Sequence, residues 1–129
     1  LRRQRQMCIR DSSESFCKAV ENFTNAGIGL CLDDFGSGYA NLNAVLRLPF
    51  DVVKMDRSLL TGITCDEQAA VFYHSIVTVM QNMGYIIVAE GAETEEEVKL
   101  LREWGVDMVQ GYYFSRPLPE TELLRLFML

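Results

Sequence analysis

The sequence repeats one arrangement four times: a short apolar run that ends near polar residues, with a segment of helical periodicity after it. Strand and helix patterns that alternate through short connections are typical of a parallel sheet. A closed barrel of eight such units needs about 250 residues, whereas this chain has 129. The sequence therefore predicts an α/β fold of four parallel (β/α) units, enough for half of a barrel.

Glycine and capping residues bound the predicted elements. Gly27, Gly84 and Gly105 each follow a helical segment, and Thr94 with Glu97 forms a capping box that opens another. We predict strands at 28–32, 51–56, 86–89 and 108–114. We predict helices at 13–26, 41–48, 66–83, 94–104 and 119–127.

Charge and cysteine content exclude several classes of function. The net charge of −6 argues against binding to nucleic-acid polymers, which depends on Lys and Arg at the phosphates, but it allows a small anionic ligand held through metal ions. Cys8, Cys17, Cys31 and Cys65 are scattered and form no C-x-x-C pair, so neither a zinc site nor a redox motif is indicated. Reduced thiols are expected, and with them a cytoplasmic location.

The first twelve residues differ from the rest of the chain. Residues 1–12 carry four arginines and no following apolar stretch, which is not the pattern of a signal peptide. The segment resembles translated sequencing-adapter sequence, and we hypothesise that it is not native. A basic disordered arm is the alternative. The domain is expected over residues 13–129.

Polar residues lie at or near the ends of all four predicted strands: Asp33 and Asp34, Lys54, Glu90, and Gln110. In a parallel barrel these ends meet at one face, where active sites lie. Carboxylate oxygens suit Mg²⁺ or Mn²⁺. A lysine flanked by apolar strand residues needs an anionic partner or access to water.

Structural explanations compete for each of these residues. The Asp33 and Asp34 pair could cap a helix or solvate a loop, and Glu90 and Glu93 could simply solvate a loop. Lys54 could lie on an edge strand and block aggregation there. His74, by contrast, is expected to have a structural or surface role, and Trp104 is expected to pack in the core at the end of a helix.

Four segments together resemble the EAL domain family in order and spacing, over roughly residues 27–129. They read LDDFGSGY at 32–39, LPFDVVKMD at 48–56, VAEGAET at 88–94 and VQGYYFSRP at 109–117. The resemblance implies the C-terminal half of a TIM-like EAL barrel. It also implies a phosphodiesterase that hydrolyses cyclic di-GMP to linear pGpG with two Mg²⁺ or Mn²⁺ ions.

The resemblance assigns a role to each polar residue. Asp33 would bridge the two ions and Asp34 would bind the second one. Lys54 would orient the water or the phosphate. Glu90 would be the general base or the partner of a metal-bound water. Gln110 would complete the water network of the second metal.

Further expectations follow from the same resemblance. Glu93 would stabilise the loop 34–41. Two glutamates and an asparagine that the family also uses have no counterpart here, so this chain alone should hydrolyse little. A degenerate EAL module that binds cyclic di-GMP or a protein partner without catalysis is the alternative. Self-association through open barrel edges or EAL dimerisation, and regulatory domains in the full-length protein, are also expected.

Overall fold

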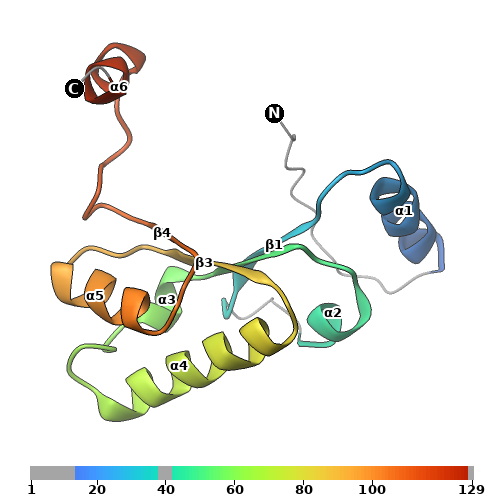
Figure 1. Ribbon diagram of the computed structural model, residues 1–129, viewed down its shortest axis with the longest axis horizontal. Coiled ribbons are helices and arrows are strands. Elements are labelled where there is room, and N and C mark those ends of the chain that lie inside the picture. The colour runs from blue at the N-terminus through green and yellow to red at the C-terminus, as the bar shows by residue number, and fades with distance from the viewer. Residues whose placement is uncertain (1–13, 38–41, 128–129) are drawn as a thin grey trace.

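Four parallel strands form one sheet in a computed structural model that describes residues 14–37 and 42–127. The strands are β1 (Cys31–Phe35), β2 (Val52–Met55), β3 (Ile86–Glu90) and β4 (Met108–Gln110). They lie side by side in the order β1-β2-β3-β4, and each pairs in parallel with the next (Figure 1). The predicted α/β fold of parallel strand-helix units is confirmed.

Six helices are assigned within the described residues. They are α1 (Glu14–Asn25), α2 (Leu42–Arg47), α3 (Arg57–Leu60), α4 (Glu67–Asn82), α5 (Glu95–Glu103) and α6 (Glu120–Phe127). Figure 1 shows α4 and α5 together on one side of the sheet, and α6 set apart at the end of an extended segment. None of these helices is long and apolar enough to cross a bilayer.

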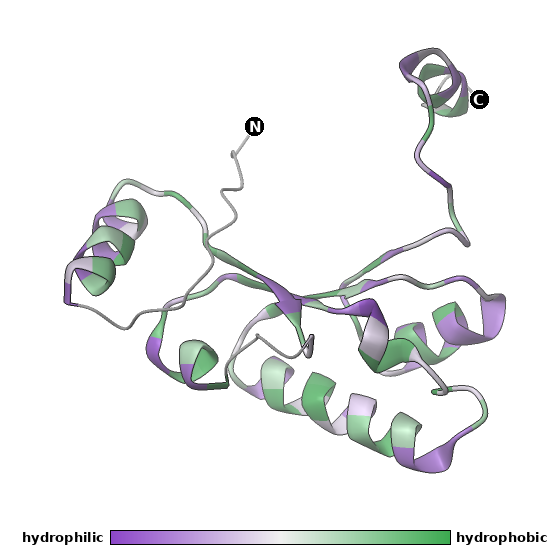
Figure 2. Cartoon of the chain, turned by 180° about the vertical axis from the view of Figure 1, so that it is seen from behind, coloured by the Kyte–Doolittle hydropathy of each residue, from purple (hydrophilic) through white to green (hydrophobic). Residues whose placement is uncertain are grey.

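The two faces of the sheet have different chemistry because side chains alternate along each strand. Val53 and Met55 on β2 point to the helix-covered face and are fully buried. On the opposite face, Ile86 and Met108 are 43% and 51% exposed. Figure 2 shows hydrophobic colours along much of α4 and hydrophilic colour where β1 ends. The uncovered face is therefore apolar at the start of the strands and polar at their ends.

Local hydrogen bonds fix where α5 begins, and aromatic packing holds it against α4. Thr94 Oγ1 accepts from the Glu97 backbone N–H at 3.2 Å, while Glu97 Oε2 accepts from the Thr94 backbone N–H at 3.3 Å, which confirms the capping box. Trp104 packs on the core with its ring 5.8 Å from that of Tyr73. The exposed His74 stacks on Trp104 at 5.2 Å.

Two strands and one short helix differ most from the predictions. The first strand starts at Cys31 and extends to Phe35, because its pairing with β2 starts at Cys31 and Val52. The fourth strand ends at Gln110, since the backbone N–H of Phe114 turns back to the carbonyl of Gly111. The four-residue helix α3 was not predicted, because so short a segment has no readable periodicity. Residues 1–13 and 38–41 lie outside the described residues, and with them the predictions made for the segment 1–12.

Candidate functional site

A lysine from β2 lies between carboxylates from the two neighbouring strands. Lys54 Nζ is 2.7 Å from Glu90 Oε1 and 3.6 Å from Asp33 Oδ1. All three side chains are between 20% and 24% exposed, so the charges are only partly hydrated. The interpretation of Lys54 as an edge-strand lysine is wrong, because β2 lies between β1 and β3.

An irregularity in β1 brings two adjacent acidic residues to the same site. Asp34 has a left-handed backbone with φ of 55°, and its N–H donates to Asp33 Oδ1 at 2.9 Å. The register between β1 and β2 shifts between Leu32 and Phe35, as at a β-bulge. A regular strand would send neighbouring side chains to opposite faces. The irregularity therefore explains why both acids can face one site.

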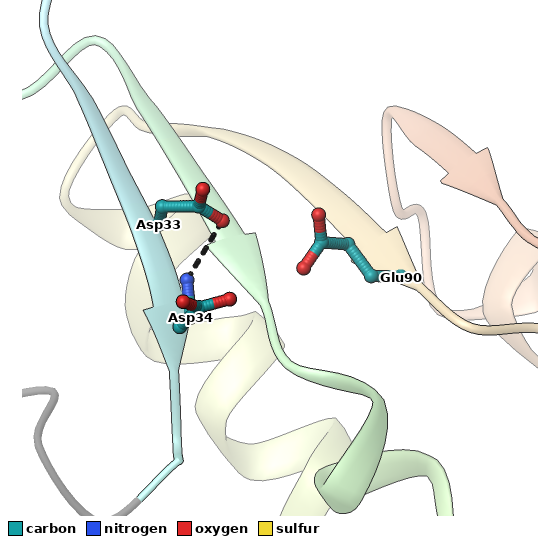
Figure 3. A group of neighbouring side chains, drawn as sticks. All are labelled: Asp33, Asp34 and Glu90. Atoms are coloured by element: carbon teal, nitrogen blue, oxygen red, sulfur yellow. Dashed lines mark hydrogen bonds between the residues drawn. The ribbon is translucent and has the colours of Figure 1, made fainter. Parts of the chain in front are cut away.

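The carboxylates of Asp33, Asp34 and Glu90 form a compact group at the carboxyl ends of β1 and β3. One oxygen from each residue lies within 4.8 Å of the others. Figure 3 shows the Asp33 and Glu90 side chains pointing toward one another across the sheet, with Asp34 beside Asp33. Such hard oxygen donors fit Mg²⁺ or Mn²⁺ better than a soft metal. This acidic cluster is a candidate metal site.

Charge coupling within the acidic cluster shifts two pKa values. The negative charge of Asp33, with some desolvation, raises the pKa of Asp34. Burial by itself would lower the pKa of Lys54, but the hydrogen bond to Glu90 and the charges of Glu90 and Asp33 outweigh it, so that the pKa is raised. Lys54 thus stays an ammonium ion. Because the carboxylates outnumber it, the site retains an excess of negative charge that favours a cation.

Gln110 and Glu93 lie beside this cluster in different ways. Gln110 is opposite Glu90 in the pairing of β3 with β4. The backbone carbonyl of Gln110 accepts from the backbone N–H of Gly91 at 2.8 Å. The Glu93 carboxylate lies 3.7 Å from Arg57 Nη2, with both side chains well exposed. Support of the loop 34–41 by Glu93 stays a prediction, because residues 38–41 lie outside the described residues.

A cavity of about 520 Å³ opens beside the cluster at the ends of β3 and β4. The side chains that line it include acidic, basic and aromatic groups from several segments. Among them are Arg57, Glu90, Glu93, Gln110, Tyr112 and Arg116. Sequence reasoning missed Arg57, Tyr112 and Arg116 as site residues. Their positions directly after the second and fourth strands are the signal that could have identified them.

A parallel sheet with helices on one face and a carboxylate cluster at the strand ends defines a parallel α/β protein with a candidate divalent-metal site. Residues 5–117 match the family model described as EAL domain. The chain belongs to the EAL domain family. The match begins inside the segment 1–12, and the non-native origin of that segment stays a prediction.

Curated relatives support this assignment. The chain is 40% identical over 104 residues to the cyclic di-GMP phosphodiesterase NbdA of Pseudomonas aeruginosa, covering 81% of this chain and 13% of that protein. It is 33% identical over 117 residues to the oxygen sensor protein DosP of Escherichia coli, covering 91% of this chain and 14% of that protein. The chain therefore spans a small part of these relatives.

Solved structures share the fold. An EAL domain protein from Listeria monocytogenes superposes with a TM-score of 0.82 at 36% identity, covering 93% of this chain and 49% of that one. A MucR phosphodiesterase in complex with c-di-GMP superposes with a TM-score of 0.76 at 33% identity, covering 90% of this chain and 47% of that one. The four-stranded sheet thus corresponds to about half of an EAL domain structure.

Proposed function

We propose that this chain supplies part of the active site of a phosphodiesterase that hydrolyses cyclic di-GMP to linear pGpG. The observation that carries the proposal is the acidic cluster, in which Asp33, Asp34 and Glu90 bring carboxylate oxygens within 4.8 Å of one another. The cyclic di-GMP phosphodiesterases among the relatives of this chain give the substrate class.

The proposed chemistry depends on divalent ions held by the acidic cluster. Two Mg²⁺ or Mn²⁺ ions, when bound, would hold the phosphate, acidify a water molecule and stabilise the leaving oxygen. Asp33 and Asp34 would supply the carboxylates that hold these ions. The cluster fits this task because its carboxylates outnumber its one ammonium group.

Lys54, Glu90 and Gln110 complete the reacting side of the site. Lys54 remains protonated and places a positive charge 2.7 Å from Glu90, where it can orient the phosphate or water and offset negative charge that develops during hydrolysis. Glu90 accepts a proton from water, or orients it, through a carboxylate already at the strand end. The Gln110 amide then hydrogen bonds water beside Glu90, its neighbour in the sheet.

A second candidate function follows from how much of an EAL domain the chain represents. It corresponds to 49% of the Listeria structure. The two glutamates and the asparagine that the resemblance also implies have no counterpart among its residues. We propose that the chain alone binds metal weakly and hydrolyses little. A module that binds cyclic di-GMP or a protein partner without catalysis is the alternative, and regulatory domains in a longer protein are part of the same proposal.

The test compares the isolated chain with a complete domain. The isolated chain, and a chimaera in which it replaces the matching half of the MucR phosphodiesterase, would each be incubated with cyclic di-GMP and Mg²⁺ or Mn²⁺. The product pGpG would be measured by chromatography. Slow turnover alone and restored turnover in the chimaera support the phosphodiesterase. Binding of cyclic di-GMP without turnover in either form supports the binding module. If neither form binds or hydrolyses cyclic di-GMP, both proposed functions are contradicted.

The open sheet suggests how the isolated chain behaves in solution. β1 and β4 are the two edges of the sheet, and Ile86 and Met108 expose apolar surface on its uncovered face. Unpaired strand edges and exposed apolar faces favour association. We propose that the chain self-associates through these features. Analytical ultracentrifugation that finds a monomer across the micromolar range would contradict this.

A further inference from the structure

The four-residue helix α3 contacts two loops that follow acidic residues of the site. It begins directly after β2, and β2 lies between β1 and β3. β1 carries Asp34 and ends one residue later, while β3 ends at Glu90. The loops after both neighbouring strands therefore start beside α3.

Leu59 of α3 packs against the loop that follows Asp34. Gly36 is the first residue after β1, and a Cβ built on it would overlap Cγ and Cδ1 of Leu59. Leu59 is itself partly buried and packs on the main core. The backbone N–H of Asp56, the N-cap of α3, also donates to the carbonyl of Phe35 at 2.8 Å. The start of this loop is thus fixed by α3 through a side chain and through the backbone.

Arg57 of α3 packs against the loop that follows Glu90. A Cβ on Gly91 would lie 2.6 Å from Cβ and Cγ of Arg57, so the loop can pass this close only without a side chain there. The guanidinium lies 3.7 Å from the Glu93 carboxylate. Because both charged groups are well exposed, this ion pair contributes little energy by itself. The fit of the arginine stem on Gly91 is therefore the main constraint on this loop.

α3 is also anchored to the rest of the chain. Leu60 is only 3% exposed in the core. The Asp56 side chain accepts from the Ser58 backbone N–H at 2.9 Å and so caps the helix. Because packed elements transmit displacement rather than absorb it, a helix of four residues held in this way moves as one body. A shift of one loop is then passed to the other.

We propose that α3 couples the loops after β1 and β3, and that Leu59 and Arg57 are positioning residues for Asp34 and Glu90. Each acts through the glycine against which it packs, without contact with an ion. Asp34 needs such support, because its φ of 55° is a costly backbone conformation for a residue other than glycine. The inference rests on the proposed function where it concerns bound ions, whereas the coupling is a property of the fold.

Amide hydrogen exchange of the full chain measures the coupling without a metal ion. The Ser37 N–H reports on the first loop, because it donates to the carbonyl of Asp34 at 3.1 Å. The Gly91 N–H reports on the second loop, because it donates to the carbonyl of Gln110 at 2.8 Å. The Trp104 N–H, at the end of α5, is the reference for general loosening of the chain.

Two truncations on α3 should each affect both loops. Leu59→Ala should speed exchange by about 5-fold or more at Ser37 and also at Gly91, while Arg57→Ala should do the same starting from the other loop. Exchange at Trp104 should change much less. The conservative variants Leu59→Met and Arg57→Lys keep the packing side chains and should restore slow exchange at both loops.

Matched controls remove the same groups elsewhere. Leu46→Ala truncates a leucine on α2 that is 70% exposed, and Arg102→Ala truncates an exposed arginine on α5. Neither control should change exchange at the two loops.

Electron paramagnetic resonance of added Mn²⁺ measures the consequence for the acidic cluster. Leu59→Ala and Arg57→Ala should each weaken Mn²⁺ binding by about 3-fold or more. The double variant should lose less than the product of the two single effects, because either truncation already frees both loops.

The outcomes separate this inference from the proposed function. If each truncation speeds exchange only at its own loop, or speeds it equally at Trp104, the coupling is wrong. Independent effects on Mn²⁺ affinity, which multiply in the double variant, would overturn it as well. If exchange is coupled but the unaltered chain binds no Mn²⁺, the proposed function fails and the coupling stands. If Mn²⁺ binds but exchange is not coupled, the inference fails and the proposed function stands.

Discussion

Lys54 Nζ lies 2.7 Å from Glu90 Oε1 and so joins the central strand pair at its polar end. The same ammonium is 3.6 Å from Asp33 on the other neighbouring strand. Lys54 thus does two things in the described structure: it compensates the carboxylates without a metal ion, and it competes with any cation for them.

Replacing Lys54 with methionine should strengthen cation binding and abolish most hydrolysis. Removal of one positive charge beside the carboxylates should tighten Mn²⁺ binding by about 5-fold, since a close charge pair is worth about 1 kcal/mol even in water-like surroundings. Without the ammonium group, the negative charge that develops during hydrolysis is less well stabilised. Turnover by the active chimaera should therefore fall by about 100-fold or more. Mn²⁺ electron paramagnetic resonance measures the first effect.

The exposed Lys99 on α5 provides the control. Lys99→Met makes the same chemical change outside the site and should alter neither Mn²⁺ affinity nor turnover. Weaker Mn²⁺ binding by Lys54→Met than by the unaltered chain would contradict the electrostatic account.

Replacing Gly91 with alanine should destabilise the turn after Glu90 through contact with Arg57. Gly91 and Gly84 have similar backbone angles, with φ of 84° and 81°, but a Cβ would meet the Arg57 stem at 2.6 Å only at Gly91, with nothing within 4 Å at Gly84. Both substitutions carry about 1–3 kcal/mol of backbone strain. Gly91→Ala should therefore lose more free energy of unfolding than Gly84→Ala in urea titrations.

A second change distinguishes contact from strain. Arg57→Ala removes Cγ and Cδ but keeps the Cβ that would lie 2.6 Å away, so it should recover only part of the extra loss in the Gly91→Ala background and leave the strain shared with Gly84→Ala. Equal losses for the two glycine variants would mean that Arg57 does not pack on Gly91 in solution.

Two tyrosines should respond in opposite directions to loss of the hydroxyl group. Among the described residues, the Tyr73 hydroxyl is buried with no hydrogen-bond partner, whereas that of Tyr85 donates to the carbonyl of Val45 at 2.8 Å. Tyr73→Phe should raise the free energy of unfolding by about 1 kcal/mol, and Tyr85→Phe should lower it by about 1 kcal/mol. Urea titration measures both, and a loss on Tyr73→Phe would reveal a partner for its hydroxyl.

Asp56 should make stability depend on pH in the acid range. Asp56 is the N-cap of α3, and its pKa is lowered from the ordinary value of 3.8 by a hydrogen bond with the Ser58 side chain and by one from the Ser58 backbone N–H at 2.9 Å. A lowered pKa in the folded state means that the carboxylate contributes its stability above 3.8 and loses it as the pH falls through the lowered value. Asp56→Ala should cost about 1 kcal/mol at neutral pH.

The pH profile of Asp56→Ala supplies the check. Its deficit relative to the unaltered chain should shrink as the pH falls below 3.8, when measured by urea titration at each pH. The matched control is Asp66→Ala, which removes the N-cap of a different helix, α4. A deficit for Asp56→Ala that does not change with pH would rule out the carboxylate as its source.

Much of the fold was predictable because its signals are local. Apolar runs, the glycines after helices and the capping box of Thr94 and Glu97 depend on residues within one or two turns of each other. The convergence of Asp33, Lys54 and Glu90 also followed from sequence, since parallel strands place their carboxyl ends at one edge. The parallel α/β fold was confirmed, and so was the membership in the EAL family.

The sequence by itself determined the alternating elements, the polar residues at the strand ends and the family. Only the tertiary structure decided the irregularity that turns Asp33 and Asp34 toward one site, the pairing of Arg57 with Glu93, and the cavity beside Arg116. These features depend on register and on packing between residues far apart in the chain. Periodicity reports which face of an element is apolar, but it carries no information about which distant backbone lies against that face.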